Sequence, residues 1–542
     1  MKRLSNNLFL LISAILLAAL FKSVLILSDR IPFNADEAVV ALMARHILQG
    51  EHPPFFYGQS YLGSLDAYLV AAGFAALGES VETIRIVQGL LYLALMVATA
   101  WLGKEVYGRW RIGVLAAFLL AIPNVNTSLY TTVSLGGYGE ALLIGVLTMA
   151  LGERLARQVE MGEGKLSAWG LWGALCGLGF WAFGLTLIFS LPVGAYMLLI
   201  SRRAIKSRKA APMRLLGLYA VVAGGFLAGA APWWIFALKH GTAGLFGELA
   251  GGAIRGVEGL AWASSVGQHL RNLILFGVTV ILGLRPPWEI RWLALPAAPF
   301  ALAFWIAVGV NILQRLRRDS GQRIIQEAPL VMAALLLAAG FVFSPFGADP
   351  SGRYFLPLAP LMALWAGNWL DGLQSKAAGW VCALVGLVIA FHLWGTVECL
   401  LRFPPGLTTQ FDPVTQVDHR RMDDLVEFLQ ENGEKYGYTN YWVSYPLAFR
   451  SAETLVFIPH LPYHQDFRYN PRDDRYIPYQ EMVAAAPRLA YITTHHAALE
   501  ARLRREFTQK GLVWEEKQIG DYRVFYHLSG KIVPAEMGLG GD

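Results

Sequence analysis

The sequence predicts a polytopic α-helical membrane protein that carries a polar α/β domain at its carboxyl end. Of its 542 residues, 55% are hydrophobic and only 15% are charged, and the mean hydropathy is +0.44. Soluble domains carry roughly 25% charged residues. The formal charge of +6 comes from loops between apolar runs, which argues against a nucleic-acid partner.

Apolar runs of about 20 residues, long enough to cross a bilayer, supply the candidate membrane helices. The first run is too long for a cleaved signal peptide, so we expect it to remain as an anchor. Two stretches, 61–78 and 270–284, are predicted to be interfacial or re-entrant, which gives about 11 transmembrane helices, or about 13 if both cross. The candidate spans are 8–27, 84–103, 112–130, 140–158, 167–181, 183–200, 214–238, 292–313, 328–345, 354–370 and 378–397.

Basic loops set the predicted orientation and domain division. The strongest, 202–209 and 315–318, are expected on the cytoplasmic side by the positive-inside rule. This makes 28–83 the first outer loop of a transmembrane domain, residues 1–402. Residues 403–542 then form an extracytoplasmic domain, and the protein lies in a plasma or inner membrane.

The carboxy-terminal domain is predicted to mix helices and strands. Helical periodicity indicates helices at 418–432 and 496–509. Aromatic and β-branched residues indicate strands near 437–444 and 454–458, followed by a strand pair at 512–518 and 521–528.

Two adjacent carboxylates, Asp36 and Glu37, follow the first apolar run. Asn34 is a suitable helix N-cap, and Glu37 occupies the capping-box position three residues later. Asp36 lies one residue before that position, so its side chain is not expected to cap the helix. A rigid, shielded carboxylate can remove a proton from a hydroxyl group, so Asp36 is the stronger candidate for a general base.

Further polar candidates lie in segments predicted outside the membrane. Gln59, Tyr61 and Asp66 could bind a substrate, whereas the neighbouring aromatic residues suit an interfacial belt. Glu140 opens an apolar run, where it either interacts with the helix dipole or faces the same cavity as Asp36.

The cationic candidates for phosphate binding are arginines. Arg353, followed by Tyr354, directly precedes an apolar run, where an arginine either snorkels to lipid headgroups or binds a substrate phosphate. Arg255 could assist. The cysteines and histidines lack metal-ligand spacing, so no metal site is predicted, although a divalent metal cofactor stays open.

These pieces together resemble the GT-C superfamily of membrane glycosyltransferases. The nearest branch is that of protein O-mannosyltransferases and aminoarabinose lipid A transferases. The resemblance spans 1–397, with a weaker match at 441–451. It rests on the Asp36–Glu37 pair, the stretch 57–65, Glu140, and the stretch 353–357 with Pro360.

The resemblance implies transfer of a sugar from a polyprenyl-phosphate donor to a lipid, glycan or protein hydroxyl on the outer membrane face. It implies that Asp36 is the base and that the anomeric carbon is inverted. The aminoarabinose branch carries a phosphate-binding lysine in the first loop, but this chain has no lysine between Lys22 and Lys104. This assigns phosphate binding to arginines, Arg353 first.

Two other functions fit the composition. A lipid-linked sugar flippase or transporter would need charged residues deep inside its spans or paired broken helices, and neither is apparent. An inactive structural subunit of a cell-envelope complex would keep the fold without the chemistry, although the presence of Asp36 argues against it.

Overall fold

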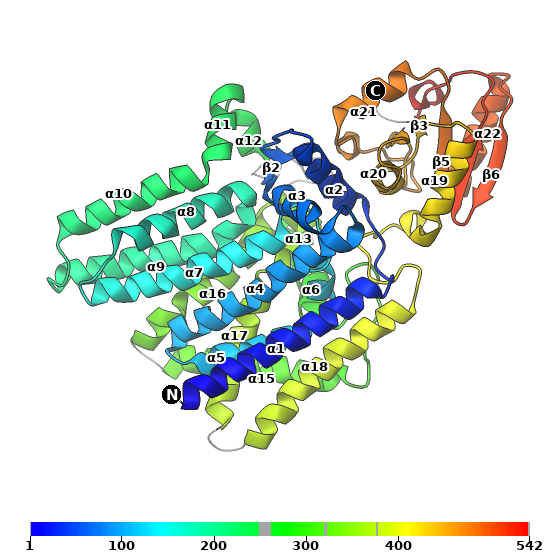
Figure 1. Ribbon diagram of the computed structural model, residues 1–542. Helices are drawn as coiled ribbons and strands as arrows, with labels where there is room; N and C mark the ends of the chain where they lie inside the picture. Colours follow the sequence, from blue (N-terminus) through cyan, green and yellow to red (C-terminus); the bar gives the residue numbers. More distant parts are fainter. Residues whose placement is uncertain (1, 249–261, 319–321, 375–377, 540–542) are drawn as a thin grey trace. The chain divides into compact units, whose positions relative to one another are not determined.

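The structure is a computed structural model that describes residues 2–248, 262–318, 322–374 and 378–539 (Figure 1). The chain divides into two compact units. The helical unit comprises Met1–Leu27, Ser60–Asp66 and Arg85–Glu398, and the second unit comprises Ser28–Gln59, Ala67–Ile84 and Cys399–Asp542. Most of residues 28–83, the predicted first outer loop, therefore group with the carboxy-terminal residues.

The helical unit is built from helices of very different lengths. In chain order they are α1 (Lys2–Leu27), α4 (Val81–Tyr107), α5 (Trp110–Ala121), α6 (Val125–Tyr130), α7 (Tyr138–Glu160), α8 (Leu166–Ala182), α9 (Leu187–Lys206), α10 (Pro212–Gly229), α11 (Ala231–His240), α12 (Ala243–Gly247), α13 (Trp262–Arg271), the π-helix η3 (Asn272–Gly277), α14 (Val278–Ile281), α15 (Ala298–Arg318), α16 (Gln322–Phe343), α17 (Leu358–Gln374) and α18 (Ala378–Leu401).

Within the described residues, seven helices are long and apolar enough to cross a membrane. Three shorter apolar helices have 10–17 residues. The chain is thus a multi-pass membrane protein, as its composition predicts. The seven spans are Asn6–Leu27, Val81–Tyr107, Gly184–Lys206, Pro212–Gly229, Ala298–Arg317, Ile325–Phe343 and Gly379–Leu401.

Glycines allow α8 and α10 to lie side by side in close contact (Figure 1). A Cβ atom on Gly173 would collide with the carbonyl oxygen of Val222, and one on Gly177 with that of Phe226. Without water to drive association, helices in a membrane gain most from such close backbone packing. The small residues therefore determine this pairing.

Two predicted spans are each divided in the structure. The span 112–130 becomes α5 and α6, because the chain leaves the helix at Ile122 before Pro123 and Asn124 caps the new helix. The span 214–238 becomes α10 and α11, which meet at Ala230 with Pro232 in the first turn of α11. A proline lacks the backbone N–H that a continuous helix would use there.

The second unit contains a five-stranded mixed sheet. Its strands are β3 (Tyr436–Tyr438), β4 (Val456–Ile458), β5 (Ala490–Thr494), β6 (Glu515–Ile519) and β7 (Tyr522–Tyr526), in the order β4-β3-β5-β7-β6. Strand β3 is parallel to β4 and β5, whereas β7 is antiparallel to β5 and β6.

The helices of the second unit are α2 (Ala35–Leu48), α19 (Met422–Glu431), α20 (Tyr441–Arg450), α21 (Ile477–Ala485) and α22 (Ala497–Gln509). Strand β1 (Phe55–Phe56) also belongs to the second unit, whereas strand β2 (Gln59–Gly63) and helix α3 (Leu65–Leu77) each contain residues of both units.

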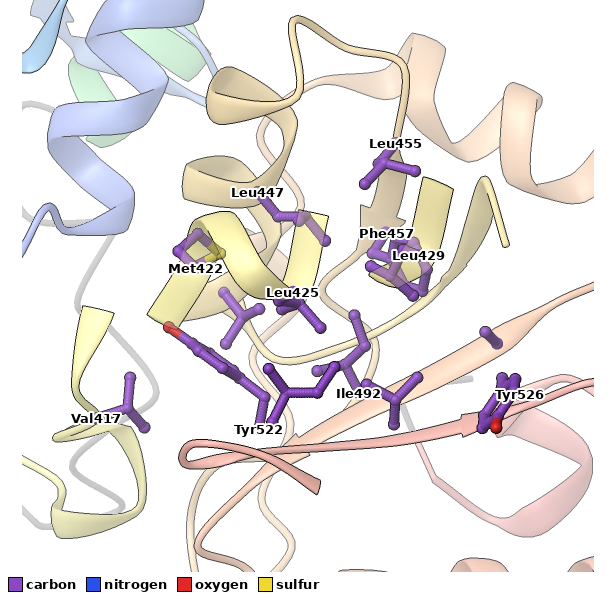
Figure 2. Close-up of a cluster of buried hydrophobic side chains, with 14 residues drawn as sticks. Val417, Met422, Leu425, Leu429, Leu447, Leu455, Phe457, Ile492, Tyr522 and Tyr526 are labelled. Atoms are coloured by element: carbon purple, nitrogen blue, oxygen red, sulfur yellow. The ribbon is translucent and has the colours of Figure 1, made fainter. Parts of the chain in front are cut away.

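A buried apolar cluster joins α19 and α20 to the sheet (Figure 2). Met422, Leu425 and Leu429 recur at helical spacing on α19 and face side chains of the strands, such as Ile492. This stripe is the periodicity that predicts the helix from sequence. The predicted helix at 496–509 and the final strand pair are also present.

Residues 441–444 are helical, so the strand predicted over 437–444 is wrong beyond Tyr438. Tyrosine, tryptophan and valine favour strands, but Asn440 accepts a hydrogen bond from the Trp442 N–H and starts helix α20. Strand β5 and helix α21 are not anticipated by the sequence patterns described above.

An ion-pair cluster ties helix α2 to the carboxy-terminal residues within the second unit. The Glu453 carboxylate lies 3.2 Å from Nη1 of Arg45 and 3.0 Å from Nε2 of His46, and the Tyr479 hydroxyl donates to it at 2.7 Å. Burial alone would raise the pKa of Glu453, but hydrogen bonds from His46, Tyr479 and Arg45 lower it to about 2. Glu453 is therefore ionised at neutral pH and holds α2 in place.

Candidate functional site

An apolar cavity of about 260 Å³ lies in the helical unit. Two of the predicted substrate-binding residues, Tyr61 and Tyr354, line it. Its volume is close to the lower limit for small-molecule sites, and apolar walls with a few polar groups are typical of such sites. The other lining residues are Phe183, Gly184, Leu185, Leu187, Ile188, Leu337, Gly340, Phe341, Ser344 and Phe346.

Arg353 lies beside this cavity rather than in its lining. Its guanidinium group is 5.1 Å from the centroid of the Tyr354 ring, and Nη2 is 2.6 Å from a carboxylate oxygen of Asp349. The side chain keeps 31% of its surface exposed. The Asp349 pair restricts the position of the guanidinium, which remains a cation beside the cavity.

Asp66 and Glu140 form a buried carboxylate pair in the same unit. Asp66 accepts hydrogen bonds from Gln88 Nε2 at 2.7 Å and from Ser134 Oγ at 2.5 Å. Glu140 is 2% exposed and interacts electrostatically with Asp66. Neither of its carboxylate oxygens accepts a hydrogen bond from another described residue. Such a buried, unsatisfied carboxylate is costly and points to a functional role.

The second unit contains the adjacent pair Asp36 and Glu37 in the first turn of α2. Asn34 caps this helix as predicted, because its side chain accepts a hydrogen bond from the Glu37 N–H at 2.9 Å. Glu37 is fully buried, whereas Asp36 is partly exposed. The two carboxylates therefore differ in environment, and only Asp36 is accessible to solvent.

The carboxy-terminal residues of the second unit supply partners for Asp36. The hydroxyl of Tyr441, the first residue of α20, donates to Oδ1 of Asp36 at 2.5 Å. The guanidinium of Arg475 lies 5.4 Å from the centroid of the Tyr441 ring. Burial, followed by the charge of Asp36, raises the pKa of Tyr441 well above its usual value. The hydroxyl therefore keeps its proton and acts as the donor.

Asp473 is a further carboxyl group close to Asp36. It is 5% exposed and accepts a hydrogen bond from Asn470 Nδ2 at 2.8 Å. Burial, opposed by Arg475 and reinforced by the charge of Asp36, raises the pKa of Asp473 to about 7. This acid therefore titrates near neutral pH beside the proposed base.

Replacing Asp473 by Asn should flatten the pH dependence of stability. Because folding raises the pKa of Asp473 from 3.8 to about 7, its stabilising contribution is present at low pH and is lost as pH rises through that range. The loss between about pH 5 and pH 8 amounts to about 3 kcal/mol. The apparent Tm of Asp473→Asn in detergent should exceed that of the wild type more at pH 8 than at pH 5. An equal difference at both values would contradict the assignment.

The sequence-predicted site residues thus fall into separate groups. Tyr61, Tyr354 and Arg353 lie around the cavity, and Asp66 lies near Glu140, all in the helical unit. Gln59 belongs to the second unit with Asp36 and Glu37 and is partly exposed. Arg255 lies outside the described residues.

Sequence reasoning missed three residues around Asp36, namely Tyr441, Asp473 and Arg475. The available signals were the polar, aromatic stretch 463–476 and the family-like segment 441–451, which carried no assigned role. Among the residues that the structure describes, no group of three or more His, Cys, Asp or Glu side chains is arranged to hold a metal ion.

Comparison with known proteins finds similarity at the level of structure. The chain superimposes on apo ArnT from Cupriavidus metallidurans with a TM-score of 0.55 and 12% identity, covering 95% of this chain and 97% of ArnT. ArnT bound to undecaprenyl phosphate matches with a TM-score of 0.50, 13% identity and the same coverage. The Archaeoglobus fulgidus oligosaccharyltransferase matches with a TM-score of 0.49 and 14% identity, over 91% of this chain and 69% of that one.

No protein-family model and no curated protein sequence matches the chain. The structural likeness to ArnT confirms the predicted GT-C-like fold, a polytopic helical membrane protein with a carboxy-terminal α/β domain. At this low identity the likeness concerns the fold, and the chemistry has to be argued from the residues of this chain.

Proposed function

We propose that the protein is a glycosyltransferase that moves a sugar from a polyprenyl-phosphate donor to an acceptor hydroxyl on the outer face of a plasma or inner membrane. The observation that carries this proposal is the apolar cavity beside Arg353, because a lipid phosphate combines an apolar chain with an anionic group. ArnT, which shares the fold, is described with undecaprenyl phosphate bound.

The reaction is a direct displacement at the anomeric carbon. Asp36 removes the proton of the acceptor hydroxyl, whose oxygen forms the new bond to the sugar. The bond from the anomeric carbon to the phosphate oxygen breaks on the opposite side, so the configuration inverts. The polyprenyl phosphate leaves with the bonding electrons, and Arg353 stabilises the developing charge.

The remaining candidates have supporting roles in this scheme. Tyr61 and Tyr354 contact the donor at the cavity, and Gln59 and Arg255 contribute polar contacts to the substrates. Asp66 and Glu140 orient sugar hydroxyl groups. The acceptor is a lipid, a glycan or a protein, and the carboxy-terminal residues face the outer side of the membrane.

The decisive measurement is release of free polyprenyl phosphate from a polyprenyl-phosphate sugar in proteoliposomes that contain the purified protein together with envelope lipids, glycans and proteins as acceptors. A transferase releases the lipid phosphate in proportion to the glycosylated product. A flippase moves the intact donor between leaflets and releases none. Donor movement without release, measured with the full chain, would reject the enzymatic proposal.

Replacing Arg353 by Gln should raise the KM for the lipid donor by about 10- to 100-fold, because charge-assisted hydrogen bonds contribute roughly 1.5–3 kcal/mol. Arg109→Gln is a matched control, since Arg109 also pairs with a carboxylate, Asp371, at 2.9 Å in the helical unit. An unchanged KM in Arg353→Gln would remove this residue from phosphate binding.

A further inference from the structure

We propose that Tyr441 is a positioning residue that holds Asp36 ready to act as the base, so that the carboxy-terminal domain contributes directly to transfer. The inference rests on the proposed function, in which Asp36 removes the acceptor proton. The observation is the hydrogen bond from the Tyr441 hydroxyl to Oδ1 of Asp36 across 405 positions of sequence, within one compact unit.

The backbone of Tyr441 is fixed by the start of helix α20. Asn440 accepts a hydrogen bond from the Trp442 N–H at 3.0 Å and donates to Oγ1 of Thr494, on strand β5, at 3.0 Å. Tyr441 is 3% exposed. The cap and the strand therefore define where the phenol points.

The ring of Tyr441 is held on several sides. Its centroid lies 5.3 Å from that of Trp442 and 5.6 Å from that of Tyr445, and the Arg475 guanidinium lies near its face. The Tyr445 hydroxyl in turn donates to the Asp473 carbonyl oxygen and accepts from the Arg475 N–H. A tyrosine packed in this way has little freedom to leave Asp36.

This arrangement suits a base that must be both ionised and oriented. A hydroxyl donor favours the charged form of a carboxylate and restrains its rotation. Because Tyr441 binds Oδ1, the geometry assigns Oδ2 of Asp36 as the oxygen that receives the acceptor proton. A fixed base accelerates the chemical step without tightening donor binding.

The test is Tyr441→Phe in the full chain, reconstituted and assayed with a polyprenyl-phosphate sugar. We expect kcat to fall by about 10- to 100-fold while the KM for the donor stays within about twofold.

Tyr491→Phe is the matched control. Tyr491 is another buried tyrosine of this domain, and its hydroxyl donates to the Ile532 carbonyl oxygen at 2.6 Å, away from Asp36. It should lose a similar amount of stability but keep the wild-type kcat. If Tyr491→Phe lowers kcat as strongly as Tyr441→Phe, the effect is one of general packing and the proposal is wrong.

Asp36→Asn separates this inference from the proposed function. Wild-type kcat in Tyr441→Phe, together with an inactive Asp36→Asn, would reject the role of Tyr441 and leave the transferase proposal standing. An active Asp36→Asn would reject the base itself. Asn440→Ala, which costs about 1 kcal/mol of capping, serves as a second variant if Tyr441→Phe does not fold. A wild-type kcat in Asn440→Ala would then count against the proposal.

Discussion

Asp36→Asn is expected to lower kcat for sugar transfer by about 10³-fold, because positioned general bases contribute typically 10²–10⁴. Asparagine has the same shape, and its side-chain oxygen can still accept the hydrogen bond from Tyr441. Insertion and folding should therefore be unchanged, as judged by size-exclusion profile and apparent Tm. The measurement is single-turnover transfer in proteoliposomes with a labelled lipid-phosphate sugar.

Two further variants make this result specific. Asp29→Asn removes an exposed carboxylate from the same loop and should retain wild-type turnover, since asparagine tolerates the positive φ of 50° at this position. Glu37→Gln should mainly reduce stability, because Glu37 is fully buried in the first turn of α2. Wild-type transfer by Asp36→Asn would eliminate Asp36 as the base.

Glu140→Gln should lower kcat/KM by at least about 10-fold and at the same time raise the apparent Tm. The activity falls because an orienting carboxylate is lost from the proposed sugar site. The stability rises because the buried carboxylate of Glu140 lies near Asp66 and accepts no hydrogen bond from another described residue. Activity and thermal unfolding are measured on the same purified protein.

Glu153→Gln provides the comparison from the same helix. Glu153 is 1% exposed on α7, and its Oε1 atom also has no hydrogen-bond partner in the described part of the chain. Its replacement should raise the apparent Tm without reducing transfer. If both variants lose activity equally, the loss reflects a change in α7 rather than a role for Glu140 at the site.

Local sequence patterns were sufficient for several features of this protein. Apolar runs identify the multi-pass membrane class, and the stripe of Met422, Leu425 and Leu429 identifies α19. Asn34 marks the start of α2 and places Glu37, rather than Asp36, three residues after the cap. These features depend on periodicity and capping, which act over a few neighbouring residues.

Other features depended on packing between distant segments. The strand propensity of 441–444 was overridden when Asn440, hydrogen-bonded to Thr494, started α20. Only that helix places the Tyr441 hydroxyl on Asp36.

By itself, the sequence therefore determined the membrane class, the helix start at Asn34 and the candidate base. The tertiary structure decided that most of residues 28–83 group with the carboxy-terminal residues and that Tyr441, Asp473 and Arg475 lie around Asp36. The physical reason is the separation along the chain of the residues that each interaction joins. Capping and hydrophobic periodicity are local, whereas hydrogen bonds and charge interactions across hundreds of residues exist only after the chain has packed.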